Sequence, residues 1–416
     1  MLRELYPRVH RRFTSLPILG PILDGYAVWL HQQGYSTDRV RQHCCTARRL
    51  TRLFQQRGIR SLQALTRERL HACAPADSQE DPDLAVVVRM LGRYVEAETS
   101  QFPPRRLSRI DQRVAAYTTY LESVRGFAPS TIGFHRGTVT ELLAHLRYEA
   151  NPTCLAALTA HDIEAFVRVV GPRLARVSLQ HVVAHLRAFL RFLASAGEAP
   201  TGLDAQIDTP RVYRGEQLPR ALPWETVRAF LHAIDRASPG GVRDYAIFLL
   251  ITTYGLRASE VVGLTLDDVE WRAGRIRIPQ RKTGGWLWLP LTDEVGAALL
   301  EYLRRVRPAR TGREVFLRRR TPAGRLKPTA IGEAFQLRSK NSGLRIPFHG
   351  PHCLRHSYAV HLLRTGISLK TIGDLLGHRS LESTCVYLRL AVEDLRDVAL
   401  PLPSGSARLD TGEVTS

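Results

Sequence analysis

Four segments in the second half of the chain place basic or nucleophilic side chains beside apolar stretches. In the first, Arg257 follows an apolar run that ends at Gly255. Burying an unpaired guanidinium is costly, so Arg257 needs an anion close by. That anion could be the carboxylate of Glu260, in an ordinary salt bridge, or a phosphate group of a ligand.

A second segment contains two histidines and an arginine after Pro351. A proline in this position favours the start of a helix, which would place His352 and Arg355 on one helical face. Together with the positive end of the helix dipole, these side chains would suit a phosphate. A zinc site made of His352, Cys353 and His356 is the competing hypothesis, but no second ligand pair at metal spacing accompanies it.

A third segment holds Lys282 between two strand-like stretches, residues 275–278 and 286–291. Gly284 and Gly285 supply the turn, so the pattern predicts a β-hairpin. Considered alone, a lysine at a hairpin tip is usually a solvated edge charge.

The fourth segment contains His378 and Tyr387. One helix is predicted to end at Gly377, and Ser380 is predicted to cap the next one. Tyr387 would then lie about two turns into that helix. Most tyrosines in such a position simply pack against their neighbours.

Taken together, the four segments resemble the tyrosine recombinase (phage integrase) family. The resemblance rests on the motifs GLRxSE, KTG, HxLRHSxA and LLGHxSxxxTxxY, which occur in that order between about residues 220 and 395. A helical stretch at about residues 108 to 200 is similar to the core-binding domain of the family. The resemblance assigns the catalytic positions to Arg257, Lys282, His352, Arg355, His378 and Tyr387.

The resemblance implies a site-specific recombinase that cuts and rejoins DNA through a covalent 3′-phosphotyrosine, in the integration, excision or transposition of a mobile element. Tyr387 would be the nucleophile and Lys282 the general acid, while His352 would exchange a proton with Tyr387. The two arginines would stabilise the charge on the phosphate, and His378 would donate a hydrogen bond to it. No metal or other cofactor is expected. The alternatives are a type IB topoisomerase and a DNA-binding protein without catalysis.

The composition agrees with a polyanionic partner. The chain has 416 residues, with 59 Lys or Arg against 39 Asp or Glu, and a formal charge of +20. Only four of the basic residues are lysines, and arginine favours bidentate contact with phosphate oxygens. A GC-rich genome could also explain the preference for arginine, but not the surplus charge.

The N-terminal residues contain no evident signal peptide, and the longest apolar run, residues 245–254, is too short to span a bilayer. We therefore expect a cytoplasmic, nucleoid-associated bacterial protein with no membrane partner.

The sequence predicts a mainly α fold with a small β-hairpin or sheet in the catalytic domain (α+β). It divides into an accessory helical module at 1–103, a SAM-like core-binding domain at 104–205, a catalytic domain at 216–400 and a disordered tail at 401–416. Residues 34–40 match residues 126–132, residues 62–66 match 155–159, and the offset drifts only from 92 to 95 further along. We interpret these matches as two copies of one helical module, with chance similarity of helical periodicity as the alternative.

The expected partner is double-stranded DNA. Four protomers on two DNA sites, or an assembly with related recombinases, follow from the family resemblance. The basic stretches 125–147 and 318–320 are candidate phosphate contacts, and the first module would bind either DNA or another protein. Residues 392–402 would pack on a neighbouring protomer or fold back on their own domain.

Overall fold

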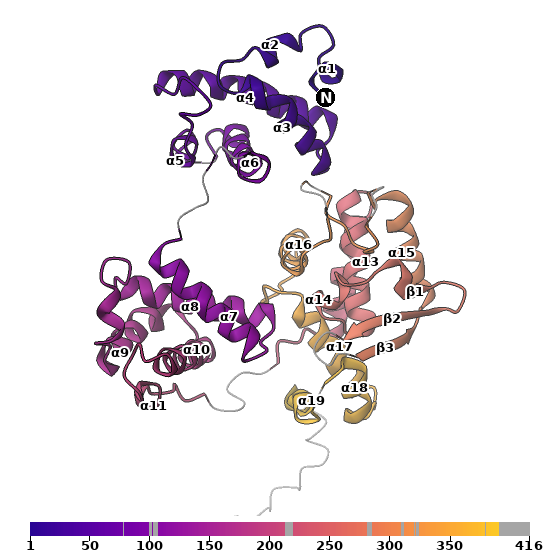
Figure 1. Cartoon of the computed structure of the whole chain (residues 1–416). Helices are drawn as coiled ribbons and strands as arrows, with labels where there is room; N and C mark the ends of the chain where they lie inside the picture. The colour runs from indigo at the N-terminus through magenta and orange to yellow at the C-terminus, as the bar shows by residue number, and fades with distance from the viewer. Residues whose placement is uncertain are drawn as a thin grey trace, which may run out of the picture. The chain divides into compact units, whose positions relative to one another are not determined.

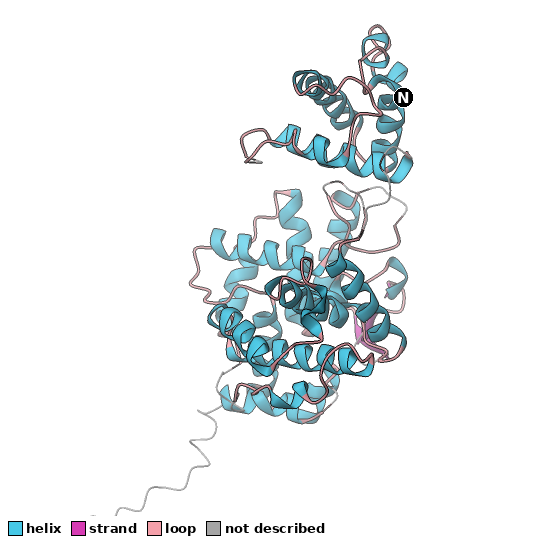
Figure 2. Cartoon of the chain, turned by 60° about the vertical axis from the view of Figure 1, so that its left-hand side comes forward, coloured by secondary structure: helices cyan, strands magenta, loops and turns pink. Residues whose placement is uncertain are grey.

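The computed structural model describes residues 1–77, 79–99, 102, 107–212, 219–280, 285–308, 312–319, 321, 324–378 and 380–390. Within these residues the chain is mainly helical, and the strands form one small sheet, drawn in magenta in Figure 2. The expected fold class, mainly α with a small sheet in the C-terminal part, is therefore confirmed.

The N-terminal part is entirely helical in its described residues, as Figure 1 shows in indigo and violet. Its helices are α1 (Leu2–Leu5), α2 (Arg11–Thr14), α3 (Gly20–Gln32), α4 (Thr37–Gln56), α5 (Arg67–His71) and α6 (Pro82–Glu98). The sequence supplies the start of α4, because the Ser36 side chain accepts a hydrogen bond from the backbone N–H of Arg39. Along α4, Val40, Cys44 and Leu50 are fully buried, which gives the helix one apolar face.

The middle part consists of a second group of helices. They are α7 (Arg109–Ser123), α8 (Pro129–His145), η1 (Pro152–Leu155), α9 (Ala160–Val170), η2 (Gly171–Arg173), α10 (Arg176–Ser195) and α11 (Leu203–Gln206). Capping boxes built on Ser108 and Thr159 begin α7 and α9. Helix α8 packs against α7 and α10, around a core that includes Leu142 and Phe189.

The C-terminal part combines helices with the sheet. Its elements are α12 (Trp224–His232), α13 (Pro239–Tyr254), α14 (Ala258–Val261), η3 (Leu266–Asp268), β1 (Val269–Glu270), β2 (Arg275–Gln280), β3 (Gly285–Pro290), α15 (Asp293–Arg305), α16 (Pro328–Asn341), α17 (His352–Arg364), α18 (Leu369–Leu376), α19 (Glu382–Cys385) and η4 (Val386–Leu390). The sheet is antiparallel in the order β1-β2-β3, and β2 pairs with β3 from Arg275 opposite Pro290 to Gln280 opposite Gly285. The predicted hairpin is confirmed, and the short strand β1 was not predicted.

Helix α13 is the centre of this part, because 11 of its 16 residues are buried. It ends where the sequence predicts, at Gly255, which adopts a left-handed conformation with φ of 64°. A Cβ atom at this position would lie 2.6 Å from side-chain atoms of both Leu376 and Tyr358. Only glycine therefore fits this turn, which leads directly to Arg257.

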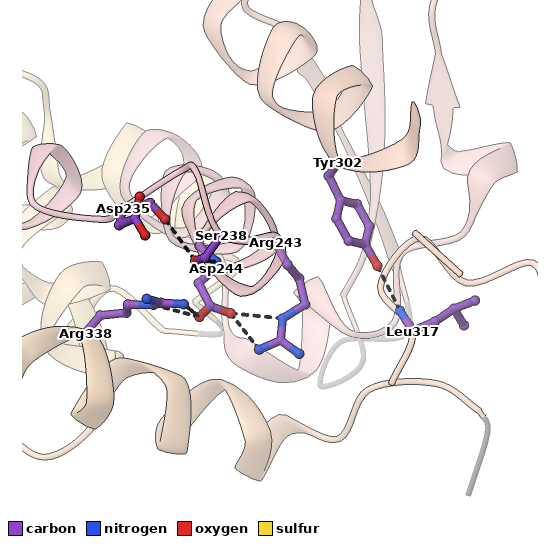
Figure 3. Close-up of polar contacts among 8 residues, drawn as sticks. Asp235, Ser238, Arg243, Asp244, Tyr302, Leu317 and Arg338 are labelled. Atoms are coloured by element: carbon purple, nitrogen blue, oxygen red, sulfur yellow. Dashed lines mark hydrogen bonds and ion pairs between the residues drawn. The ribbon is translucent and has the colours of Figure 1, made fainter. Parts of the chain in front are cut away.

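A buried carboxylate fastens α16 to the start of α13, as Figure 3 shows. Asp244 is 2% exposed. It accepts hydrogen bonds from Nε of Arg243, at 2.9 Å, and from Nε of Arg338 on α16, also at 2.9 Å. In the same view, the Tyr302 hydroxyl on α15 accepts the backbone N–H of Leu317 at 3.3 Å. These contacts hold α16 to α13 and α15 to the segment at Leu317, and α13 leads to the site.

No helix in the described ranges has the length and apolar character needed to cross a membrane.

Candidate active site

Arg257 lies at the N-cap of the short helix α14, and a carboxylate fixes it from two sides. Glu260 accepts the backbone N–H of Arg257 at 2.8 Å through Oε2, and Nη1 of the Arg257 guanidinium at 2.7 Å through Oε1. Glu260 is buried, while Arg257 keeps part of its side chain exposed. Of the two anions that the sequence allowed for Arg257, the structure shows the Glu260 carboxylate, and part of the guanidinium can still reach a ligand.

Arg355 lies on the first turn of α17 and is almost completely buried, with 2% exposure. Its Nη1 donates to the carbonyl of Gly255 and its Nη2 to the carbonyl of Leu376, both at 2.5 Å. The Glu260 carboxylate lies 3.9 Å from Nη1. Burial, followed by the charge of the nearby Arg257, lowers the pKa of Arg355 to about 10. Arg355 therefore remains charged at neutral pH and is held rigidly by backbone acceptors.

Tyr387 is 2% exposed and packs in a small cluster with residues of α17 and α18, including Val360 and Leu376. It lies in the 3-10 segment η4 and not two turns into an α-helix. The prediction that Ser380 caps the preceding helix is wrong. The N-cap of α19 is Leu381, and the Ser380 hydroxyl instead lies 3.2 Å from that of Ser383. Two consecutive short helical turns, and not one longer helix, carry the tyrosine.

The Tyr387 hydroxyl is hydrogen-bonded to a histidine that the sequence analysis did not assign to catalysis. Nδ1 of His356 lies 3.1 Å from the hydroxyl oxygen. His352, which was expected to exchange a proton with Tyr387, instead meets the His356 ring edge-on, with 4.4 Å between ring centroids. Residues i and i+4 of one helix, here His352 and His356, share a face, and that spacing was the available signal for His356.

Burial makes the His356 imidazole an acceptor. Desolvation, followed by the positive charges of its neighbours, lowers the pKa of His356 to about 4. At neutral pH the ring is therefore uncharged, and its Nδ1 can accept the phenolic hydrogen of Tyr387. Burial raises the pKa of Tyr387, while the charges of Arg355 and Arg257 act in the opposite direction. The phenol is thus protonated at rest, and both arginines are close enough to favour its ionised form.

His378 follows Gly377, the left-handed residue that ends α18 as predicted. Its Nδ1 lies 2.8 Å from the hydroxyl of the buried Thr384, and its ring stacks on the Tyr387 ring with 6.3 Å between centroids. Burial and the nearby arginines lower the pKa of His378 to about 4. Because Nδ1 is used by Thr384, the Nε2 edge is the one available for a ligand.

A cavity of about 360 Å³ opens beside the histidines. Its walls include Arg220, Phe348, His352, His356 and Val386. This cavity gives a ligand access to His352 and to His356, and His356 contacts the Tyr387 hydroxyl.

The structure therefore brings together Arg257, His352, Arg355, His378 and Tyr387, five of the six predicted positions. The sixth, Lys282, lies outside the described residues, as do Arg320 and residues 392–402. The sequence analysis missed His356 and the Thr384 hydroxyl. Two guanidiniums, a phenol and uncharged imidazoles in one site can bind the oxygens of a phosphate ester and direct a hydroxyl nucleophile at it.

Two family models match the chain. The model of the phage integrase family matches residues 220–394, and that of the phage integrase N-terminal SAM-like domain matches residues 114–197. The first match spans all the motifs of the site, and the second spans most of α7 to α10.

Curated relatives match over most of their length. The candidate integrase/recombinase y4rA of Sinorhizobium fredii is 33% identical over 401 residues, covering 94% of this chain and 96% of that protein. The tyrosine recombinase XerD of Mycobacterium tuberculosis is 31% identical over 303 residues, covering 69% of this chain and 95% of that protein.

Solved structures share the fold. The XerH recombinase in its post-cleavage complex with difH aligns with a TM-score of 0.54 at 17% identity, over 80% of this chain and 92% of that one. The Tn1549 transposon integrase (residues 82–397) aligns with a TM-score of 0.51 at 18% identity, over 69% of this chain and 98% of that one.

Fold and site together define a DNA strand-transfer enzyme of the tyrosine-nucleophile class. The chain belongs to the phage integrase family, the tyrosine recombinases, whose members cut and rejoin DNA.

Proposed function

We propose that this chain is a site-specific recombinase that moves a mobile element by cutting duplex DNA with Tyr387. The observation that carries the proposal is the placement of the Tyr387 hydroxyl in one buried site with two guanidiniums and with His356, 3.1 Å away. The names of the relatives, which include recombinases and a transposon integrase, support the same function.

In the cleavage step the Tyr387 oxygen attacks the phosphorus and the bond from phosphorus to the 5′ oxygen breaks. The phosphate becomes a 3′-phosphotyrosine, so the bond energy is kept for rejoining and no external energy source is required. Arg257 and Arg355 stabilise the charge that develops on the nonbridging oxygens. Since the guanidinium of Arg355 is fixed by two carbonyls, little reorganisation is needed during the reaction.

Two protons must move in this step. The phenolic proton leaves Tyr387 through a histidine, and the departing 5′ oxygen receives a proton from Lys282, which lies between β2 and β3 in the sequence. His356 is the histidine that contacts the hydroxyl, and we assign to His352, its ring neighbour, the exchange of that proton with the cavity. His378 donates to a nonbridging oxygen through Nε2. Rejoining is the reverse sequence of the same transfers.

Double-stranded DNA is the proposed partner, at the bacterial nucleoid, with four protomers on two sites or a mixed assembly with related recombinases. A lambda integrase tetramer bound to a Holliday junction is among the solved structures with a similar fold. The stretches 125–147 and 318–320 are the proposed phosphate contacts outside the site.

The test is covalent trapping on nicked duplexes tiled across the DNA that flanks the gene. In such substrates the cut strand end diffuses away, and religation fails. Wild-type protein, Tyr387→Phe and the matched control Tyr358→Phe, a tyrosine of α17, are compared on denaturing gels. We expect a protein–DNA band from the wild type and the control but not from Tyr387→Phe. A band from Tyr387→Phe would mean that another residue attacks the DNA.

The same assay separates the alternatives. A topoisomerase would relax a supercoiled plasmid that carries no recombination site. Binding without a covalent band on any tile would favour a DNA-binding role without catalysis.

A further inference from the structure

The same buried hydrogen bond occurs in two separate parts of the chain. Between α3 and α4, the Tyr26 hydroxyl lies 3.0 Å from Nδ1 of His43. Between α7 and α8, the Tyr117 hydroxyl lies 2.9 Å from Nδ1 of His135. All four side chains are buried. A buried tyrosine–histidine pair at sequence separations of 17 and 18 is specific enough to identify equivalent positions.

The aromatic rings around this bond are also duplicated. Tyr26 stacks on Trp29 with 6.3 Å between centroids and 19° between planes. Tyr117 stacks on Tyr120 with 6.3 Å and 17°. In each part a further aromatic ring contacts the histidine. That ring belongs to Tyr35, at 5.1 Å from His43, and to Phe127, at 5.5 Å from His135.

The correspondence continues along both stretches. Gly34 and Gly126, which precede α4 and α8, both have positive φ, at 84° and 61°. Thr66 and Thr159 both cap the following helix through their side chains. Further pairs of buried residues keep the offset found in the sequence: Val40 and Ile132, Leu70 and Ile163, Val88 and Val183, Leu91 and Leu186, and Tyr94 and Phe189. The model of the SAM-like domain matches the second copy, at residues 114–197. Because the first copy has equivalent residues at equivalent positions, we infer that the N-terminal helices share the fold of that domain.

The two copies differ on their outer surfaces. Helix α4 carries five arginines and one aspartate, whereas α8 carries one arginine and one glutamate. The exposed arginines Arg48 and Arg52 of α4 correspond to Thr140 and Ala144 of α8. The shared fold therefore does not require these charges. Arginines four residues apart on a helix also repel each other slightly, so they weaken the isolated helix.

The arginines of α4 fall into two kinds. Arg39 and Arg49 are held by aspartates, with Nη atoms 3.8 Å from Asp83 and 2.6 Å from Asp81. Within the described residues, no ion pair or hydrogen bond holds Arg48 or Arg52. Two exposed guanidiniums on one helical face can therefore reach an external anion without breaking an internal contact.

We propose that the face of α4 bearing Arg48 and Arg52 binds the phosphate backbone of duplex DNA, so that the N-terminal helices are a second DNA-binding module of the core-binding type. The proposal rests on the proposed function in that the chain acts on DNA. The two guanidiniums are separated by about 6 Å along the helix axis, and duplex DNA presents one charge per about 1.7 Å of its axis. Both arginines can therefore contact phosphates of one duplex.

The test is the salt dependence of binding by the full-length protein to a 40-base-pair duplex of arbitrary sequence. The variant is Arg48→Gln/Arg52→Gln, and the matched control is Arg39→Gln/Arg49→Gln, which changes the charge of the same helix equally. Each phosphate contact contributes about 0.9 to the slope of log K against log salt. We expect the variant slope to be shallower than that of the wild type by about 1.8. Between 50 and 200 mM salt, the variant would then lose about tenfold less affinity than the wild type. The slope of the control should differ from that of the wild type by less than about 0.9, the contribution of one phosphate contact.

A variant slope equal to that of the wild type, or equal changes in variant and control, would overturn the proposal. A protein partner for this face would give the first result. Glutamine is nearly as good a helix former as arginine, so α4 should remain folded in the variant. Circular dichroism of the double variant and of the two single variants checks that a change in slope does not come from unfolding. Since the assay requires no cleavage, its outcome is independent of whether Tyr387 attacks DNA.

Discussion

The hydrogen bond between His356 and Tyr387 allows a sharp test of how the nucleophile is held. His356→Leu keeps a side chain of similar size but removes the acceptor. The Tyr387 hydroxyl, in a side chain 2% exposed, would then be buried without its partner. An unsatisfied buried hydroxyl costs about 1–3 kcal/mol, so the free energy of unfolding should fall by that amount.

The effect on cleavage should be larger than the effect on stability. A positioned proton acceptor contributes roughly 10²–10⁴-fold to a reaction of this kind. We expect His356→Leu to slow formation of the covalent complex at least 100-fold while DNA affinity stays unchanged. His356→Asn should recover most of the stability, because its amide begins at the same Cγ and can place an oxygen close to the position of Nδ1. It should not recover the rate, because an amide oxygen accepts a hydrogen bond but not the phenolic proton.

The assay is single-turnover trapping on the nicked duplex that gives the wild-type band, with unfolding measured separately by denaturant titration. His361→Asn is the matched control, since His361 lies on the same helix but stacks on Trp224, with 4.1 Å between ring centroids. Wild-type cleavage by His356→Leu would refute the reasoning. So would a His356→Asn variant that cleaves as fast as the wild type, because proton transfer to residue 356 would then be irrelevant.

Two further predictions concern the frame of the site, and a third concerns the buried histidines of the chain. Glu260→Gln should lower the free energy of unfolding by about 2–3 kcal/mol, because it leaves the guanidinium of Arg257 facing a neutral amide; denaturant titration checks this, and an unchanged midpoint would contradict it. Gly255→Ala should cost about 2–4 kcal/mol, since it combines a positive φ with a Cβ 2.6 Å from Tyr358; an unaltered melting temperature would show that the turn relaxes. Among the described residues, burial lowers the pKa to about 4 for His43, His185, His356 and His378. The unfolded chain binds these protons from about pH 6.5 downward, whereas the folded chain does not until about pH 4. Stability should therefore fall across that window, by at most about 1.4 kcal/mol per pH unit for each histidine and by less for those in contact with solvent. Denaturant titrations at pH 7 and pH 5 measure the loss, and equal stability at the two values would count against it.

Much of the site could be predicted from the sequence because its parts are local. Gly255 and Gly377 end helices as expected, since glycine is the residue that adopts the left-handed conformation most readily. The support of Arg257 by Glu260 follows from their spacing of three residues. The hairpin between β2 and β3 follows from alternation and the glycine pair, and the helical repeat was visible as matching residues.

The parts that were missed depend on contacts between segments that are distant in the chain. His356 and Tyr387 are 31 residues apart, and nothing in either local pattern indicates that they meet. The capping role assigned to Ser380 failed because its hydroxyl pairs with the hydroxyl of Ser383 and, within the described residues, with no backbone N–H of α19. The tyrosine–histidine bond in each helical module was likewise hidden, although Tyr26 with Tyr117 and His43 with His135 lie at offsets of 91 and 92, close to that of the repeat.

The two hydrogen bonds from Arg355 to backbone carbonyls have a consequence for which substitutions inactivate this enzyme. The carbonyls belong to Gly255, at the end of α13, and Leu376, at the end of α18. The guanidinium thus joins the C-terminal ends of two helices and neutralises part of their negative dipoles. Catalytic geometry is thereby tied to the integrity of both helices, so substitutions far from the site that loosen either end would produce folded but inactive proteins. Inactive variants collected at random should therefore include residues of α13 and α18 that never approach DNA.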